Sequence, residues 1–307
     1  MRIVVAVGGN ALLRRGETPD AAIQEKHVQA AADALAPLAR RHRLIVTHGN
    51  GPQVGLLALE NAGDPALSAP YPFDVLGAQT QGMIGYWLAQ ALHNRAGLPA
   101  AAVLTRTLVR ADDPALRQPA KFIGPVYDEE TARRLAGRNG WQVRRDGSAW
   151  RRVVPSPEPA DVVERPLIRL IADSGTTVVC GGGGGVPVVA DADGQLHGVE
   201  AVVDKDLTAA LLASALHADA LLLLTDVAAV EDGHGTATAR PIRHAHPADL
   251  RARTFPAGSM GPKVDAACWF VESGGALAAI GRLEQAAAVL AGRAGTTVSP
   301  VPPAGRG

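Results

Sequence analysis

Aromatic residues are scarce in this chain of 307 residues, and neither sign of charge is in excess. Phenylalanine, tryptophan and tyrosine make up 4% of the sequence, and 30 basic side chains balance 30 acidic ones. A neutral chain without a basic arm lacks the electrostatic footprint of nucleic-acid-binding proteins, and nothing in it resembles a polybasic membrane segment. We therefore expect small molecules as partners, with no nucleic acid and no membrane.

Cysteine is almost absent, and so are long apolar runs. Cys180 and Cys268 are far apart and have neither zinc-ligand spacing nor a CxxC arrangement, so we interpret both as core residues in a reducing compartment. The most apolar stretch, residues 207–224, contains His217 and Asp219 and fails as a membrane span. The apolar run near the N-terminus is too short for a signal peptide. These features predict a soluble, cytoplasmic protein.

Lysine is scarce as well, because arginine supplies 26 of the 30 basic residues. Lysine carries a compact point charge on a flexible stem, whereas arginine carries a rigid fork. A chain that uses arginine so widely makes each remaining lysine a candidate for a specific role. The four lysines are Lys26, Lys121, Lys205 and Lys263.

Short β-branched runs alternate with alanine-rich amphipathic stretches, a pattern typical of βα units that feed a mainly parallel sheet. We predict strands over residues 3–7, 44–47, 101–104, 177–180, 220–224 and 278–280. We predict helices over residues 21–41, 53–61, 77–96, 166–173, 206–216, 263–273 and 283–291.

Composition changes between about Ala111 and Glu164, where prolines, charges and two tryptophans replace the alanine-rich pattern. So long a loop without structure would be unusual in a compact domain, so we predict an inserted small subdomain. We accordingly divide one overall domain into an N-terminal lobe (residues 1–110), the insert (111–164) and a C-terminal lobe (165–307).

Several predicted strands end in glycine clusters. The first ends in Gly8-Gly9-Asn10, the second in His48-Gly49-Asn50-Gly51 and the fourth in the run Gly181 to Gly185. Ligands of open α/β sheets bind at the carboxyl ends of the strands, and glycine lets backbone N–H groups approach an anion closely. Three such turns indicate an anion-lined cleft, although one glycine pair alone is more often a tight turn.

The glycine clusters match neither the Walker A pattern nor GxGxxG, which disfavours P-loop and dinucleotide-binding folds. Five consecutive glycines are hard to explain as a turn alone, because ordering them costs much backbone entropy. Asn10 and Asn50 offer amide donors or simply form turns. We interpret His48 as a capping or core histidine.

Two lysines lie at predicted helix starts. Lys205 stands between Asp204 and Asp206, which either form a solvated cluster or hold the ammonium for a phosphate. Lys263 follows a glycine turn, where a lysine is unfavourable unless an anion lies between it and the helix. The placement of Lys263 therefore indicates a function.

The remaining candidates carry less weight by themselves. Lys121 lies in the insert, where a lysine is usually solvated, and Lys26 is assigned to the surface of the first helix. Asp226 follows a strand, so it caps the next segment or contacts a nucleotide, with capping favoured. Together these residues predict a phosphoryl-transfer site of backbone amides and ammonium groups, with no protein cluster for a metal. Mg²⁺ would then be held mainly by nucleotide phosphates and water.

Seven motifs, in order, resemble those of the carbamate kinases in the amino-acid kinase fold family. They are VAVGGNALL from Val5, LIVTHGNGPQVG from Leu44, QTQGMIGYWL from Gln79, KFIGPVY from Lys121, RRVVPSPEP from Arg151, GVEAVVDKD from Gly198 and AGSMGPK from Ala257. The resemblance implies a three-layer αβα sandwich around an open, mainly parallel sheet of about eight strands, with a small protruding subdomain, and a homodimer. It implies reversible transfer between ATP and carbamate to give ADP and carbamoyl phosphate.

The resemblance also implies roles for residues. Lys205 and Lys263 would neutralise the nucleotide phosphates and the transferred group, Asp206 would orient these ammoniums, and Lys121 would reach in from the subdomain. Phosphoryl and carbamate binding falls to Gly8, Gly9, Asn10, Gly49, Asn50 and Gly51. Nucleotide binding falls to Gly181, Gly182, Gly183, Asp226 and Met260.

Two alternatives stay open at this point. Another small-acid kinase of the same fold, such as an acetylglutamate kinase, would share the scaffold. A non-catalytic sensor of carbamoyl phosphate or nucleotide is suggested by residues 231–240, which are acidic and glycine-rich where the family often has aromatic or apolar residues. We expect the enzyme to make ATP in arginine or agmatine catabolism.

Overall fold

The computed structural model describes residues 1–14, 16–236, 238–256 and 258–300. At its centre is an eight-stranded sheet in the order β15-β17-β16-β12-β1-β2-β9-β3, in which the pair β16 and β17 is antiparallel and the other pairs are parallel. The strands are β1 (Arg2–Val7), β2 (Arg43–His48), β3 (Ala100–Ala102), β9 (Thr177–Val179), β12 (Ala220–Thr225), β15 (His244–Ala245), β16 (Ala278–Arg282) and β17 (Thr296–Val298). All six predicted strands lie in this sheet, which confirms the predicted fold class.

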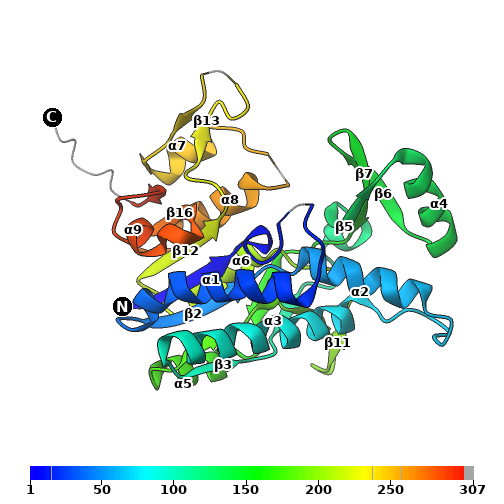
Figure 1. The fold of residues 1–307 in the computed structure, drawn as a ribbon, viewed down its shortest axis with the longest axis horizontal. Helices are drawn as coiled ribbons and strands as arrows, with labels where there is room; N and C mark the ends of the chain where they lie inside the picture. Colours follow the sequence, from blue (N-terminus) through cyan, green and yellow to red (C-terminus); the bar gives the residue numbers. More distant parts are fainter. Residues whose placement is uncertain (15, 237, 257, 301–307) are drawn as a thin grey trace.

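Helices cover both faces of the sheet, because the strands are apolar on both sides (Figure 1). Along β1, Ile3, Val5 and Val7 belong to one core, whereas Val4 and Ala6 belong to the other. The first core is completed by α1 (Ala21–Ala39), α3 (Phe73–Ala96) and α9 (Ala286–Leu290), and the second by α5 (Arg165–Asp173), α6 (Lys205–Ala215) and α8 (Met260–Glu272). A parallel sheet buried on both faces is the expected result of βα connections.

Cys180 and Cys268 are both buried, as their interpretation as core residues predicts. Burial raises the pKa of the Cys180 thiol to about 12 and that of Cys268 to about 11. Neither is therefore a thiolate at neutral pH.

Three further sheets lie outside the central one, and the smallest pairs β13 (Glu231–Asp232) with β14 (Arg240–Pro241). A four-stranded sheet has the order β11-β10-β4-β8, from β4 (Arg106–Val109), β8 (Pro159–Val162), β10 (Val186–Ala190) and β11 (Leu196–Gly198). A three-stranded sheet has the order β5-β7-β6, from β5 (Lys121–Tyr127), β6 (Gln142–Asp146) and β7 (Ala149–Val154). With α4 (Glu129–Asn139), the three-stranded sheet stands to one side of the body in Figure 1, and we call these four elements the small subdomain.

The remaining elements are short, apart from α2 (Gly51–Gly63). They are the strands β13 (Glu231–Asp232) and β14 (Arg240–Pro241), the helix α7 (Pro247–Arg251) and the 3-10 helices η1 (Gly9–Ala11), η2 (Pro114–Arg117), η3 (Gly182–Gly184) and η4 (Leu283–Gln285). The helix predicted over residues 283–291 is divided into η4 and α9.

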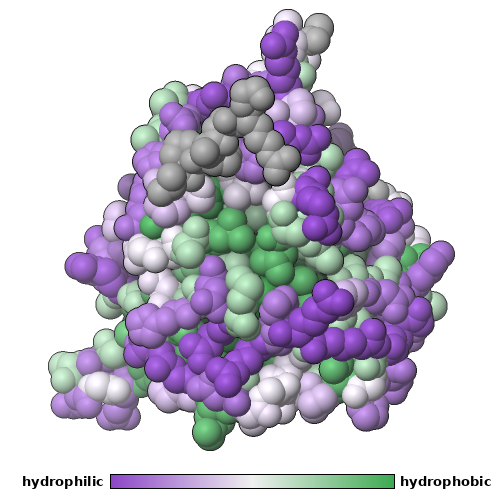
Figure 2. Space-filling model, turned by 90° about the vertical axis from the view of Figure 1, so that its left-hand side faces the viewer, coloured by the Kyte–Doolittle hydropathy of each residue, from purple (hydrophilic) through white to green (hydrophobic). Residues whose placement is uncertain are grey.

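In the described part of the chain, no helix combines the length and the apolar character that a bilayer crossing needs. Figure 2 shows one face, on which hydrophilic side chains surround a central apolar area.

Candidate active site

Two glycine turns meet at the carboxyl edge of the central sheet. Val7, the last residue of β1, pairs with His48 of β2 on one side and with Leu224 of β12 on the other, so the turns after these strands are neighbours. A Cβ atom on Gly49 would lie 2.6 Å from the backbone nitrogen of Gly9. Only glycine fits there, and the contact brings the backbones of the two predicted phosphoryl- and carbamate-binding turns together.

Backbone N–H groups are available in the first turn. Among the described residues, the N–H groups of Gly9 and Asn10 donate to no backbone carbonyl, whereas that of Gly8 donates to Leu224 O at 2.8 Å. Gly51 begins α2, whose first N–H groups lack intrahelical acceptors. Both turns can therefore present N–H donors to an anion.

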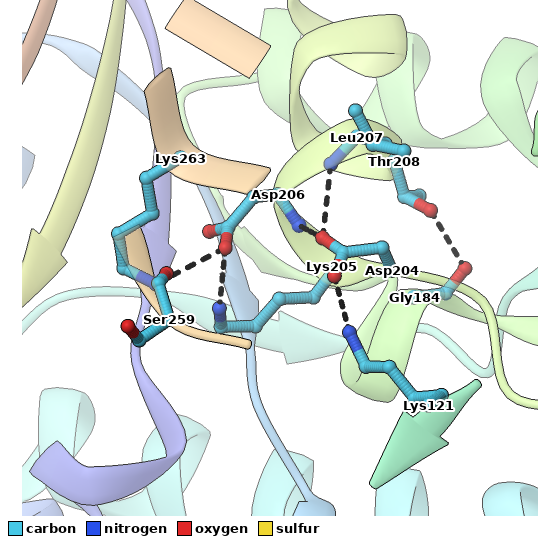
Figure 3. Close-up of polar contacts among 9 residues, drawn as sticks. All are labelled: Lys121, Gly184, Asp204, Lys205, Asp206, Leu207, Thr208, Ser259 and Lys263. Carbon is cyan, nitrogen blue, oxygen red and sulfur yellow. Dashed lines mark hydrogen bonds and ion pairs between the residues drawn. The ribbon is translucent and has the colours of Figure 1, made fainter. Parts of the chain in front are cut away.

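Lys205 and Lys263 converge on one carboxylate oxygen (Figure 3). Lys205 is the first residue of α6, and its Nζ donates to Oδ2 of Asp206 at 2.9 Å. Lys263, in the first turn of α8, donates to the same oxygen at 3.2 Å. The other oxygen of Asp206, Oδ1, is buried without a hydrogen-bond partner among the described residues. The arrangement places two ammonium groups and two helix N-termini at one point, which favours a bound anion.

Burial affects the two ammonium groups differently. For Lys205, burial alone would lower the pKa, but the carboxylates of Asp206 and Asp204 outweigh it and raise the pKa. For Lys263, burial and the charge of Lys205 prevail over Asp206 and lower the pKa. A phosphate bound between the two lysines would add a negative charge beside Lys263, and this charge would raise the pKa of Lys263 again.

Lys121 reaches the same region from the small subdomain. Its Nζ donates to Oδ2 of Asp204, the residue that caps α6 by accepting from the backbone N–H of Asp206 at 2.9 Å. Burial would raise the pKa of Asp204, but the charges of Lys121 and Lys205 and the hydrogen bonds to the carboxylate hold it well below its usual range. The structure thus holds Lys121 on Asp204, the carboxylate next to Lys205 in the chain.

Asp204 was not among the site residues chosen from the sequence. Its position before the helix start and beside Lys205 signalled a cap, but nothing local signalled the pairing with Lys121. The two residues are 83 positions apart.

The run Gly181 to Gly185 lies beside the β2 turn. A Cβ on Gly183 would lie 2.2 Å from Nδ2 of Asn50, and one on Gly182 would lie 2.4 Å from the ring of His48. This follows from the strand order, since β9 is next to β2, whereas β12, which leads to Asp226, lies beyond β1. The resemblance implied nucleotide binding for Gly181, Gly182 and Gly183, and in the structure they pack against the end of β2 and the turn that follows it.

His48 and Asn50 are enclosed by this packing. His48 is fully buried, its Nδ1 lies 3.1 Å from Gly49 O, and burial lowers its pKa to about 4. Asn50 donates from Nδ2 to Thr80 Oγ1 at 2.8 Å. A neutral, enclosed histidine agrees with its interpretation as a core residue.

Asp226 and Met260 lie on the other side of β1. Asp226 accepts from Nδ2 of Asn10 at 3.2 Å and from Oγ1 of Thr225 at 3.0 Å. These hydrogen bonds and the charge of Lys263 outweigh burial and lower its pKa. Met260 is the first residue of α8, one turn before Lys263. Both residues therefore lie near Lys263, on elements from the C-terminal half of the chain.

Comparison with known proteins agrees with this architecture. The sequence profile of the amino acid kinase family matches residues 1–281. The carbamate kinase of Rhizobium meliloti is 48% identical over 97% of this chain and 93% of its own, and that of Escherichia coli K12 is 51% identical over 97% and 99%. The chain belongs to the carbamate kinases of the amino acid kinase family.

Solved carbamate kinases share the fold as well. The structure of the carbamate kinase from Giardia lamblia bound to AMP-PNP superposes with a TM-score of 0.87 and 36% identity, covering 97% of this chain and 98% of that one. Membership in this family makes the chain an ATP-dependent phosphotransferase, as the motifs predicted.

Proposed function

We propose that this enzyme transfers a phosphoryl group reversibly between ATP and carbamate, giving ADP and carbamoyl phosphate. One observation carries the proposal, namely that Lys205 and Lys263 converge on Oδ2 of Asp206 at the start of two helices. Phosphoryl transfer requires in-line positioning and charge neutralisation more than covalent chemistry. Ammonium groups and backbone amides supply both.

Each part of the site has a task in this proposal. The N–H groups of Gly9 and Asn10, with Gly8, receive the transferred phosphoryl group, and the turn Gly49 to Gly51 binds the carbamate side. Lys205 and Lys263 stabilise the negative charge on the oxygens that pass between donor and acceptor, and Asp206 orients both ammoniums. Lys121 adds a third positive charge from the small subdomain.

We assign the nucleotide to the side of Asp226 and Met260, beside Lys263. We assign Gly181, Gly182 and Gly183 to the acceptor side instead, because they pack against His48 and Asn50. The division into residues 1–110, 111–164 and 165–307 stays our proposal for the acceptor lobe, the insert and the nucleotide lobe.

Mg²⁺ fits this site only with the help of the nucleotide. Within the described residues, no group of three histidine, cysteine or acidic side chains could hold a metal, and Oδ2 of Asp206 already accepts from two ammoniums. We propose that nucleotide phosphates and water supply most of its ligands. When bound, the ion would offset the charge of the phosphates. Chelation with EDTA should abolish turnover, and added Mg²⁺ should restore it.

The deciding experiment measures ATP formed from ADP and carbamoyl phosphate in a coupled spectrophotometric assay with Mg²⁺. Acetylglutamate and aspartate with ATP are tested beside it. We expect turnover with carbamoyl phosphate alone. Turnover only with the two amino-acid substrates would indicate another small-acid kinase, and binding by calorimetry without turnover would indicate a sensor.

We propose further that two copies of the chain form a homodimer in the cytoplasm. Tyr86 on α3 is 59% exposed and Leu104, two residues after β3, is 52% exposed. These segments pack on each other, since a Cβ on Gly85 would lie 2.9 Å from Cβ of Ala102. Exposed apolar groups that cluster are typical of an interface. Light scattering at several concentrations should give twice the mass of one chain, and Tyr86→Glu should lower it.

We propose that the enzyme works toward ATP in arginine or agmatine catabolism. Carbamoyl phosphate is a mixed anhydride, so transfer of its phosphoryl group to ADP is chemically favourable. Measuring the equilibrium ratio from both directions tests this, and an equilibrium in favour of carbamoyl phosphate would overturn it.

A further inference from the structure

The small subdomain is fixed to the body by an apolar cluster separate from the two main cores. Val54 and Ala58 of α2 and Phe73 and Leu76 of α3 contribute from the body, while the subdomain contributes Ile123 of β5 and Val154 of β7. The contact is close, since a Cβ on Gly55 would lie 2.2 Å from Cα of Gly124. The subdomain is therefore docked on α2 and α3 through one packed surface.

Arg152 of β7 lies between the two parts at this surface. Its guanidinium carbon is 4.6 Å from the ring centroid of Phe73 and 4.4 Å from that of Trp141. Phe73, at the start of α3, is 2% exposed and belongs to the body, whereas Trp141 directly precedes β6 in the subdomain. One cation thus contacts an aromatic ring on each side, and such contacts are strongest where water is excluded.

The charge of Arg152 is partly buried but compensated. Burial lowers its pKa to about 10, and the carboxylate of Glu200 opposes this shift. Glu200 also accepts from the backbone N–H of Phe73 through Oε2 at 2.8 Å. Arg152 therefore stays protonated at neutral pH and faces a carboxylate four residues before Asp204.

Strand pairing connects Arg152 to Lys121. Arg152 is opposite Ile123, and Lys121 is opposite Val154, on the antiparallel strands β5 and β7. Residues two apart on a strand, and residues directly opposite, share one face of a sheet. Lys121 and Arg152 therefore lie on the face that docks on the body, and Lys121 cannot keep its place at Asp204 if this face moves away.

We infer that Arg152 is a positioning residue that holds the small subdomain docked so that the ammonium of Lys121 is in place for transfer. The inference rests on the proposed function, in which Lys121 acts on the transferred group. Arg152 contacts neither Asp204 nor the glycine turns among the described residues; it acts through the aromatic rings of Phe73 and Trp141.

A double-mutant cycle tests this on the full enzyme. We expect Arg152→Met to lower kcat about tenfold to thirtyfold, the factor set by loss of a desolvated cation–π contact, with the KM for ADP unchanged. In a Lys121→Ala background the same change should have less than about a twofold effect, because the group it positions is already gone. Arg145→Met, an exposed arginine on the adjacent strand β6, is the control and should leave turnover unchanged.

The outcomes separate the inference from its alternatives. Normal kcat in Arg152→Met, or an equal loss in both backgrounds, would overturn the positioning role. If Arg152→Met fails to fold by circular dichroism, Arg152→Gln, which also removes the charge, takes its place in the same cycle, with the same two criteria. An unsubstituted enzyme that makes no ATP from carbamoyl phosphate would instead refute the proposed function, so the two failures are distinguishable.

Discussion

The Nζ of Lys263 lies 3.2 Å from Oδ2 of Asp206, an oxygen that also accepts from Lys205. Asp206 is 57 positions earlier in the chain, and only the packing of α6 beside α8 brings the pair together. Two ammoniums that share one oxygen repel each other, and an anion bound between them would offset this repulsion. The pair is therefore suited to hold a phosphate in transfer.

Removal of either ammonium should slow the reaction strongly. We expect Lys205→Ala and Lys263→Ala each to lower turnover on the order of a hundredfold, about 3 kcal/mol of transition-state stabilisation. Lys205→Arg and Lys263→Arg should rescue poorly, because a guanidinium fork needs more room than one ammonium. Steady-state kinetics checks both, with exposed Lys26→Ala on α1 as the control. Near-normal turnover in both arginine variants would contradict the assigned roles.

The pH dependence should depend on Asp206. The pKa of Lys263 is already lowered by burial and by Lys205, and Asp206 acts in the opposite direction. In Asp206→Asn this opposing charge is lost, so the pKa of Lys263 falls further and its ammonium is lost at a lower pH. We expect the alkaline decline of kcat/KM to move to lower pH in this variant. An unchanged alkaline limb would mean that Lys263 is not the group that titrates.

Gly49 should tolerate no side chain. In Gly49→Ala the new methyl group would lie 2.6 Å from Gly9 N and 3.4 Å from Cδ of Lys205, so the two turns must separate. We expect turnover to fall at least tenfold, since small displacements at such a site are costly. Gly63→Ala is the control, because a Cβ on Gly63, the last residue of α2, would have no neighbouring atom within 4 Å. This variant should behave as the unsubstituted enzyme. Equal activity of the two variants would refute close contact between the turns.

Gly183 offers a test of which substrate its glycine run serves. Gly183 (φ +64°) and Gly194 (φ +79°) both have left-handed backbone, but a Cβ meets Asn50 at 2.2 Å only in the former, with nothing within 4 Å in the latter. Each alanine variant should lose about 1 kcal/mol of stability from its backbone conformation.

Gly183→Ala alone should lose more than this 1 kcal/mol or so of stability, because its new methyl group also meets Asn50. It should raise the KM for carbamoyl phosphate and leave the calorimetric binding of ADP unchanged. Thermal unfolding and kinetics check these results. Weakened ADP binding in Gly183→Ala would instead indicate that the run Gly181 to Gly185 contributes to nucleotide binding.

Much of the central fold could be predicted from local pattern. Buried parallel strands such as β1 and β12 are apolar on both faces, and alanine-rich periodicity marked the helices between them. The strands of the small subdomain were not predicted individually, because β6 and β7 carry arginines at positions that pair across strands. Their docking rests on contacts with α2 and α3.

By itself the sequence determined which chemical groups stand at which element ends, because helix starts, glycine turns and the scarcity of lysine are local properties. It thus identified Lys205, Lys263 and the turns after β1 and β2 as candidate site groups. Only the tertiary structure decided which of these groups meet. It paired Lys121 with Asp204 and placed the run from Gly181 beside Asn50, because strand order and subdomain docking follow from long-range packing that no local pattern encodes.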